Sequence, residues 1–146
     1  MYQSIYRAYC RLSKGDVANL KRCNLDKMAN SPAYFRVLKM TGLPDNKQTL
    51  RVLFLYVGIL VEQDKGRAKT VATALHDAGV KEQNIIQITR GGDNSIEYLK
   101  RHLVRCNHIC AEDLGNLAQY WDDNNRRRLL KNYILAQPIN TDKELL

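Results

Sequence analysis

The chain has 146 residues and a mass of 16.8 kDa, which is the size of a single domain. Apolar residues make up 45% of it, enough for a hydrophobic core, and its net charge of +8 gives a sequence pI near 9.4. The longest apolar run, Leu50 to Val61, is too short to cross a bilayer. The composition therefore excludes a membrane-spanning protein, and the basic excess favours an anionic partner such as nucleic acid.

Helix signals recur throughout the first half of the chain, where strand signals are nearly absent. Ser31 followed by Pro32 predicts an N-cap with proline at the first helical position, and Gly42 predicts the end of that helix. Asp45, with a glutamine three residues later, resembles a capping box for the apolar run. The predicted helices are Gln3 to Ser13 with Gly15 as its stop, a short helix capped by Asp16, Ala33 to Thr41, the apolar helix through Leu50 to Val61, and Arg67 to Ala78.

The second half repeats this pattern. Three isoleucines lie between Lys81 and Arg90, where flanking Glu and Gln residues favour a helix over a strand, and Asn94 with Glu97 resembles another cap pair. The predicted helices are Lys81 to Arg90, Ser95 to Cys106, Ala111 to Trp121 and Asn125 to Ala136. The sequence thus predicts an all-α fold, a compact bundle of eight or nine helices. If it divides into two small lobes, Gly79 is the expected boundary. Residues 1–137 are expected to form the domain and residues 138–146 a C-terminal tail.

The cysteines and the first residues of the chain indicate in which cellular compartment the protein is expected. No signal peptide pattern opens the sequence, because Gln3, Arg7 and Arg11 interrupt its first residues. The four cysteines are sparse and irregularly spaced, unlike the dense pattern of a disulfide-stabilised secreted domain. We therefore expect reduced thiols and a cytoplasmic protein.

No complete active-site pattern occurs in the sequence. The turn Arg90 to Asp93 lacks the lysine and the spacing of a phosphate-binding loop. The acid pairs Glu112-Asp113 and Asp122-Asp123 stand at predicted helix starts, where carboxylates interact favourably with the helix dipole, so capping explains them better than catalysis. We expect a protein that is not an enzyme and needs no cofactor.

Four potential zinc ligands, His102, Cys106, His108 and Cys110, lie within nine residues. Structural zinc sites join two ligand pairs across a loop, and so compact a run does not easily surround a tetrahedral ion. Cys106 also extends the apolar stripe of its predicted helix. These features favour a core cysteine with surface histidines, and we expect no metal site.

The basic residues form small, separate patches that suit phosphate contacts along an extended strand. Arg101 and Arg105 are expected on one helix face. Simpler explanations exist for each patch: Arg101 can pair with Glu97 one turn earlier, and cations of the last helix can simply face solvent. The patches are Lys21-Arg22, Arg51, Lys65-Arg67-Lys69, Arg90, Lys100-Arg101 with Arg105, and Arg126-Arg127-Arg128 with Lys131.

Base reading is less well supported by the sequence than backbone binding. A helix-turn-helix would need a short turn such as Ala78-Gly79, but the helix after it carries isoleucines that favour burial. Aromatic rings can stack on bases, yet most of them are expected on apolar faces, with a hydroxyl at the rim: Tyr6, Tyr9, Tyr56, Tyr120 and Trp121.

A succession of short apolar and basic segments runs through roughly residues 4–137: Ile5-Tyr6-Arg7-Ala8, Gly15, Leu20-Lys21-Arg22, Pro32-Ala33-Tyr34-Phe35-Arg36, Arg51-Val52-Leu53-Phe54, Ile85-Ile86-Gln87-Ile88-Thr89-Arg90, Leu99-Lys100-Arg101-His102-Leu103, Tyr120-Trp121 and Arg128-Leu129-Leu130-Lys131-Asn132-Tyr133-Ile134-Leu135. Their order and spacing resemble the CasB family, the small subunit of the type I-E CRISPR surveillance complex Cascade. No single segment is diagnostic, and the stretch between Val61 and Gly79 matches only loosely.

The resemblance implies an all-helical, non-catalytic subunit, present in two copies arranged head to tail in Cascade. Its implied partners are the Cascade backbone and large subunits, the guide RNA, the target DNA with its displaced strand, and the second copy. Its implied role is to stabilise the guide–target heteroduplex and the displaced strand of the R-loop in antiviral defence. Unwinding exchanges one duplex for another of similar stability, so modest backbone contacts can decide its outcome.

The resemblance also implies which residues bind nucleic acid. Matching basic positions are Lys21, Arg22, Arg51, Arg90, Lys100 and Arg101, and Arg105 and Arg126 are added from the same predicted faces. Asp122-Asp123 depart from the more basic family pattern after the aromatic pair, which weakens any strand contact there. The alternative is a stand-alone helical DNA-binding regulator. It would bind tightly and sequence-selectively alone, whereas a Cascade subunit would bind weakly, salt-sensitively and without sequence preference.

Overall fold

Ten helices and one small sheet make up residues 1–138, the part of the chain that the computed structural model describes. The helices are α1 (Tyr2–Arg11), α2 (Lys14–Lys21), α3 (Leu25–Met28), α4 (Pro32–Thr41), α5 (Lys47–Tyr56), α6 (Val71–Asp77), α7 (Glu82–Arg90), α8 (Ser95–Leu103), α9 (Ala111–Gln119) and α10 (Asp123–Ala136), and the strands are β1 (Val61–Glu62) and β2 (Ile109–Cys110). The predicted all-α fold is confirmed, with α3 as an unpredicted short helix. The predicted tail lies outside the described residues from position 139 onward.

Helix α4 begins and ends as its sequence predicts. The Ser31 hydroxyl accepts a hydrogen bond from the Ala33 N–H at 3.2 Å, and Pro32 occupies the first helical position. Gly42 ends the helix with a φ of +70°, a left-handed conformation that glycine adopts without a Cβ penalty. These local signals were sufficient to predict both ends of α4, because each acts within one helical turn.

Two helices begin at residues other than those predicted. Ser13 caps α2 by accepting the Asp16 N–H at 3.1 Å, so Gly15 lies inside α2 and is not the stop of α1. Asn46 caps α5, and the neighbouring Asp45 instead accepts a hydrogen bond from the hydroxyl of a tyrosine in α4. In both cases the predicted cap was wrong because a competing Ser or Asn stood nearby.

The apolar run is shorter as a helix than predicted. Helix α5 ends at Tyr56, and Gly58, with a φ of +74°, turns the chain into β1. The next helix, α6, starts only at Val71 and is capped by the Thr70 side chain. Residues 57–70 therefore connect two helices instead of extending them.

Within this connection lies β1, which pairs in parallel with β2, and the sequence did not predict either strand. Val61 lies opposite Ile109 in the register of β1 and β2. On the other side of β2, the Lys69 N–H donates to the His108 carbonyl and the Cys110 N–H donates to the Lys69 carbonyl, each at 2.7 Å. Both ends of the loop after β1 are thus attached to β2.

Helices α7, α8, α9 and α10 occupy nearly their predicted ranges, but one predicted cap is wrong. Asn94 makes no side-chain cap to α8, and Glu97 does not reach back to it. The Glu97 carboxylate instead accepts the Leu25 N–H at 3.0 Å, at the start of α3. A residue expected to act locally therefore joins two helices far apart in the sequence.

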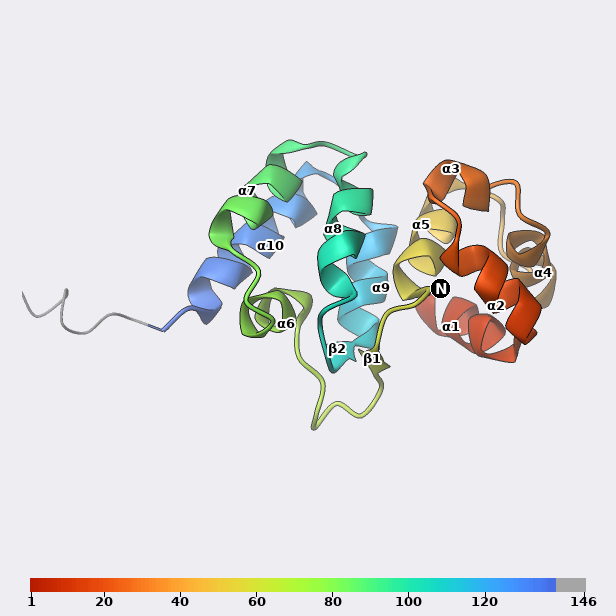
Figure 1. Ribbon diagram of the computed structural model, residues 1–146, viewed down its shortest axis with the longest axis horizontal. Coiled ribbons are helices and arrows are strands. Elements are labelled where there is room, and N and C mark those ends of the chain that lie inside the picture. The colour runs from red at the N-terminus through yellow and green to blue at the C-terminus, as the bar shows by residue number, and fades with distance from the viewer. Residues whose placement is uncertain (139–146) are drawn as a thin grey trace, which may run out of the picture.

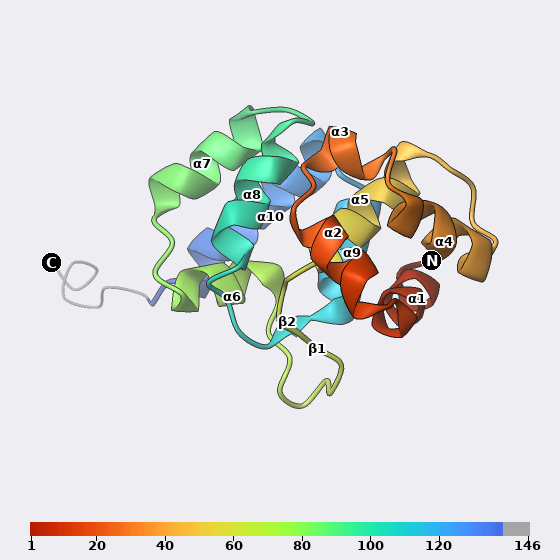
Figure 2. The ribbon, with the colours of Figure 1, turned by 45° about the vertical axis from the view of Figure 1, so that its right-hand side comes forward.

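The helices pack around one continuous core in an elongated molecule. Helices α1 to α5 form one end, α6, α7 and the C-terminal part of α10 form the other, and α8 and α9 lie between them (Figures 1 and 2). The helices before and after Gly79 both pack on α10, so this glycine does not separate two lobes. None of the helices in residues 1–138 is long and apolar enough to cross a membrane, and all four cysteines are free.

The centre of the molecule depends on close packing of α5 against α9. The Tyr56 hydroxyl donates to the Ala111 carbonyl at 2.6 Å, and burial holds the pKa of this phenol well above its usual range. Gly115 lies next to it in α9, where a Cβ would overlap Tyr2 and the Tyr56 hydroxyl. Glycine is therefore required at position 115 by space, although its backbone is helical.

Candidate nucleic-acid interface

Four of the eight predicted contact residues line one groove of about 400 Å³. Lys21 and Arg22 stand at the C-terminal end of α2, and Lys100 and Arg101 lie on the last turn of α8. Phe54, from α5, also lines the groove. Helices α2 and α8 thus bring together basic residues that are up to 80 positions apart in the sequence. We call this the basic groove.

The apolar face of α8 explains how two of these cations come to line the groove. Ile96, Leu99 and Leu103 are completely buried, which orients that side of the helix toward the core. Lys100 and Arg101 follow on the remaining sides of the last turn. Cations are also favoured there by the negative end of the helix dipole.

Lys100 occupies a fixed position in the groove. Its Nζ donates to the Phe54 carbonyl at 2.6 Å and lies 4.0 Å from the centre of the Phe54 ring. This carbonyl is in the last turn of α5, and the Gly58 N–H, four residues later, donates to the Tyr9 hydroxyl instead. Burial lowers the pKa of Lys100 to about 8, although the nearby Cys23 and Glu97 partly oppose that shift.

The other cations of the groove are not neutralised by carboxylates. Among residues 1–138, Lys21, Arg22 and Arg101 form no ion pair. The alternative explanation for Arg101, a pairing with Glu97, does not apply, because Glu97 hydrogen-bonds the start of α3. Glu97 is the single carboxylate among the residues that line the groove. The groove therefore carries an excess of positive charge available to an anionic ligand.

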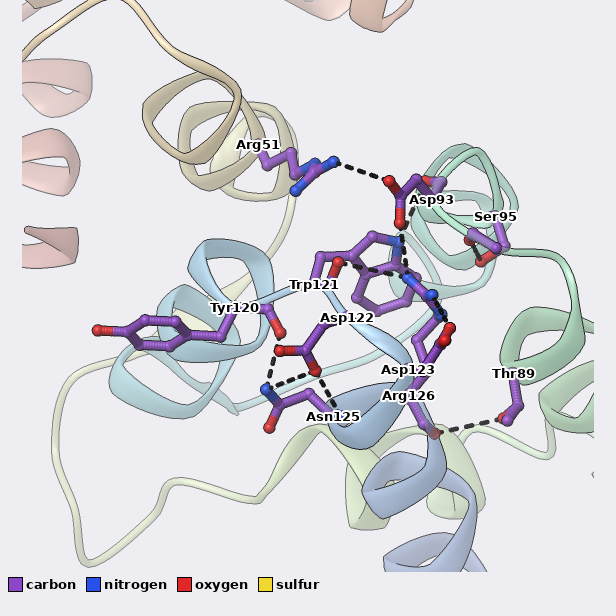
Figure 3. Close-up of polar contacts among 11 residues, drawn as sticks. Arg51, Thr89, Asp93, Ser95, Tyr120, Trp121, Asp122, Asp123, Asn125 and Arg126 are labelled. Atoms are coloured by element: carbon purple, nitrogen blue, oxygen red, sulfur yellow. Dashed lines mark hydrogen bonds and ion pairs between the residues drawn. The ribbon is translucent and has the colours of Figure 1, made fainter.

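Two further predicted contacts, Arg51 and Arg126, belong to an ion-pair network centred on Asp93 (Figure 3). Arg51 lies 3.6 Å from one Asp93 carboxylate oxygen and Arg126 lies 3.1 Å from the other. Arg126 also pairs with Asp123 and lies 5.4 Å from the Trp121 ring centre. Asp93 completes the network by accepting the Trp121 Nε1–H on its backbone carbonyl at 3.1 Å.

Burial makes Arg126 unsuitable as a strand contact, contrary to the sequence-based expectation. Its side chain is only 3% exposed. Helix α10 starts at Asp123 and is capped by Asp122, which places Arg126 one turn later on its inner side. The predicted capping role of Asp122 is confirmed. Arg51, at 13% side-chain exposure, is similarly committed to Asp93.

The remaining two predicted contacts are exposed but lie outside the groove. Arg90 is on the last turn of α7. Arg105 follows the end of α8 at Leu103 and donates to His102 Nδ1 at 2.8 Å, so it does not share a helix face with Arg101. Their assignment as contacts stays a prediction.

The four potential zinc ligands have different surroundings. Burial and the neighbouring arginine lower the pKa of His102, and Cys106 is buried with its thiol 3.6 Å from the His102 carbonyl. His108 lies 3.2 Å from Glu62, and Cys110 belongs to β2. Within residues 1–138, no three His, Cys, Asp or Glu side chains gather in a way that could hold a metal ion.

A second basic hollow, of about 220 Å³, lies between α1 and α4. Arg7 and Arg11 line it together with Met40 and Thr41, and neither arginine forms an ion pair within residues 1–138. The two arginines are four residues apart on α1, a spacing that places side chains on one helix face. This spacing is the one signal in the sequence that could identify the pair as a basic patch.

Comparisons with known proteins show similarity in structure. No protein-family model matches the chain, and no curated protein matches it in sequence. The structure is similar to a chain in the crystal structure of E. coli Cascade bound to a PAM-containing dsDNA target with a 32-nt spacer, with a TM-score of 0.80. The two chains are 22% identical, and the match covers 92% of this chain and 94% of the other. They share a fold.

Proposed function

We propose that this protein is a non-catalytic small subunit of a type I-E Cascade surveillance complex, of the CasB kind. The observation that carries the proposal is the fold match to a chain of DNA-bound Cascade, which extends over nearly the whole length of both chains. The ordered segments that resemble CasB support the same assignment independently of the fold.

The basic groove is the proposed site for nucleic acid backbones. Lys21, Arg22 and Arg101 have no carboxylate partner within residues 1–138, so a phosphate would not have to displace one. Lys100 supplies a further donor that is already held in place by Phe54. Contacts of this kind position a strand without reading its bases, and they weaken as salt increases.

In the complex, such contacts would stabilise the guide–target heteroduplex and the displaced DNA strand. R-loop formation is a near-balanced exchange of duplexes, so a few charge-assisted contacts are enough to shift it. This is why a protein without catalytic groups can promote target binding. The role requires that the groove faces the nucleic acid once the subunit is assembled.

Exposed apolar side chains support assembly with other proteins, including a second copy of this chain. Phe35 and Met40 on α4 are 46% and 48% exposed, and Ile134 and Leu135 on α10 are 44% and 70% exposed. These two helices reach opposite ends of the molecule (Figure 1). In a head-to-tail arrangement, one surface of a subunit contacts a different surface of the next copy. The apolar residues of α4 in one copy and of α10 in the other would allow such a contact.

Co-expression with the neighbouring genes of its locus tests the proposal. The tagged chain should co-purify with Cascade backbone and large subunits and with an RNA of repeat-spacer length. The double variant R22E/R101E should still enter the complex but should lower the yield of R-loops on target DNA. Purification of the chain alone, without RNA or partners, would overturn the proposal. Tight, sequence-selective DNA binding by the isolated chain would instead support a stand-alone regulator.

A further inference from the structure

A pocket of about 350 Å³ lies between α6, α9 and α10 and shares no residue with the basic groove. Val71, Leu117 and Leu129 supply apolar surface to its lining. Asn116 of α9 and Asn132 of α10 contribute side-chain amides. The volume falls within the range of about 300–1,000 Å³ that is usual for small-molecule sites.

Three of the polar side chains that line this pocket, those of Asn116, Arg128 and Asn132, have no partner within residues 1–138, whereas Thr70, Asp113 and Asn125 are hydrogen-bonded. Among residues 1–138, the amides of Asn116 and Asn132 make no side-chain hydrogen bond, and Arg128 forms no ion pair. Asp113 is the single acid of the lining, and its carboxylate accepts the Val71 N–H at 2.7 Å. The pocket therefore offers both amide donors and amide acceptors beside one available cation.

Tyr120, at the end of α9, is an exposed aromatic residue among those that line the pocket. The sequence placed this residue on an apolar face, but it is 51% exposed, and its ring points away from the network around Trp121 (Figure 3). Its backbone is held from both sides, because its N–H donates to the Asn116 carbonyl and its carbonyl accepts a hydrogen bond from Asn125. The ring therefore projects from a well-anchored position at the end of α9.

We propose that this pocket binds one unstacked nucleobase of a single-stranded nucleic acid. A base has flat faces that stack on an aromatic ring such as Tyr120, and edges that pair with the side-chain amides of asparagine. Arg128, with the exposed Arg127 and Lys131 on the same helix, supplies positive charge for the adjoining phosphates. These cations favour a nucleotide over a peptide segment, the other ligand that asparagine amides commonly bind. The inference rests on the proposed function in one respect, because that function supplies the single strand from which the base would come.

Titration with uncharged nucleosides tests the pocket separately from the basic groove. Adenosine, cytidine, guanosine and thymidine carry no phosphate, so their binding does not depend on Lys21 or Arg101. We expect at least one of them to shift the side-chain amide NMR signals of Asn116 and Asn132 in a saturable way. The absence of saturable shifts for all four nucleosides would overturn the inference. Saturation of the same signals by an extended peptide, but by no nucleoside, would also overturn it.

Two matched variants then test the stacking. Replacing Tyr120 with leucine keeps an apolar side chain but removes the ring, whereas Y120F removes only the hydroxyl. Y120L should weaken binding of the responding nucleoside about 5- to 150-fold, the range expected for base–aromatic stacking, and Y120F should leave it nearly unchanged. Equal affinity in Y120L and the unmodified protein would contradict the proposal. The variant R22E/R101E should bind nucleosides normally, so failure of the proposed function and failure of this inference give different results.

Discussion

The Nζ of Lys100 donates to the backbone carbonyl of Phe54 at 2.6 Å, joining α8 to the last turn of α5 across the basic groove. The same ammonium lies over the Phe54 ring, so part of its hydration is replaced by protein. Its charge is therefore held at a fixed place, but at a cost in desolvation that lowers its pKa to about 8. The charge of the groove therefore changes near physiological pH, which is not the case for a groove lined by freely exposed lysines.

Nucleic acid binding should weaken as the pH rises through about 8. Lys100 loses its proton in this range, and a neutral amine attracts a phosphate much less than an ammonium does. We expect about a tenfold loss of affinity between pH 7 and pH 9, comparable to one charged hydrogen bond of ~1.5 kcal/mol. Fluorescence anisotropy with a labelled single-stranded oligonucleotide at constant ionic strength measures it.

Two variants identify the group responsible for this pH effect. K100M should bind more weakly at pH 7 and should lose most of the change in affinity between pH 7 and pH 9. C23S should retain it, which separates Lys100 from the thiol of Cys23 in the same groove. A pH dependence that persists in K100M would show that another group is titrating.

The same pKa shift predicts a pH dependence of stability. The pKa of Lys100 is lowered in the folded state, so between about pH 8 and pH 10.4 the unfolded chain binds more protons. The free energy of unfolding should therefore rise with pH across this window relative to K100M, by at most ~3 kcal/mol. Urea titrations of the unmodified protein and K100M at pH 7.5 and pH 10 measure this difference. Equal changes in the free energy of unfolding of the two proteins would refute the prediction.

Reversing the exposed charges of the groove should reduce both affinity and its salt dependence. Removing one phosphate contact makes the slope of log affinity against log salt concentration shallower by about 0.7 for a single strand. We expect R22E/R101E to show a slope shallower by at least this amount. The control K47E changes an exposed lysine on α5 that does not line the groove, and should have little effect. Equal reductions in both variants would indicate only a response to net charge.

The network around Asp93 should contribute substantially to stability. Among residues 1–138, D93A leaves the buried Arg126 with the exposed Asp123 as its one remaining carboxylate partner, and it removes the carboxylate that pairs with Arg51. Uncompensated buried charges are costly, so we expect a loss of ~2–4 kcal/mol in the free energy of unfolding. The fluorescence of Trp121, the one tryptophan of the chain, reports the transition from within the network.

A double-mutant cycle distinguishes coupling from general damage at this site. Suppose that D93A loses stability mainly because Arg126 is then buried without its partner. In that case, R126M/D93A should be more stable than the sum of the two single losses in the free energy of unfolding predicts. Additive losses would mean that Asp93 and Arg126 act independently, despite their 3.1 Å separation.

Two glycines in helices should respond in opposite ways to alanine. In G115A the new methyl group would overlap Tyr2 and Tyr56, so overpacking should cost ~1–3 kcal/mol or more. In G15A the methyl group meets only the Ser13 hydroxyl oxygen at 3.9 Å, and the better helix former should add ~0.5–1 kcal/mol of stability. Thermal unfolding of both variants measures the difference, and a stable G115A would contradict the close packing of α5 on α9.

Most of the fold could be predicted from the sequence because helix starts and stops are local signals. Ser31, Pro32 and Gly42 fixed α4 within one turn at each end. The errors arose where a residue had two possible partners. Glu97 was expected to cap its own helix but hydrogen-bonds the start of α3, and nothing in a local pattern shows a contact across 72 residues. The two-residue strands were missed for the same reason, since their pairing joins Val61 to Ile109.

The candidate site was predictable only in part. Positive charge and the resemblance to CasB selected Lys21, Arg22, Lys100 and Arg101, and the structure places all four in one groove. Neither signal could distinguish them from Arg126, because charge alone does not reveal burial. That distinction depends on Asp93, which the sequence placed in an ordinary turn. Similarly, the exposure of Tyr120 follows from where α9 ends, a boundary that sequence patterns fix poorly.

The packing of α9 against α5 has a consequence for how this protein is made. Helices α1 to α5 emerge from the ribosome first, yet the Tyr56 hydroxyl finds its acceptor only at Ala111, 55 residues later. Helices α1 and α3 also pack on α5, but until α9 has been synthesised the face of α5 that packs on α9 has no permanent cover, and the nascent chain exposes part of its future core. This half of the molecule therefore cannot complete its folding during its own translation, and final closure must wait until most of the polypeptide is available.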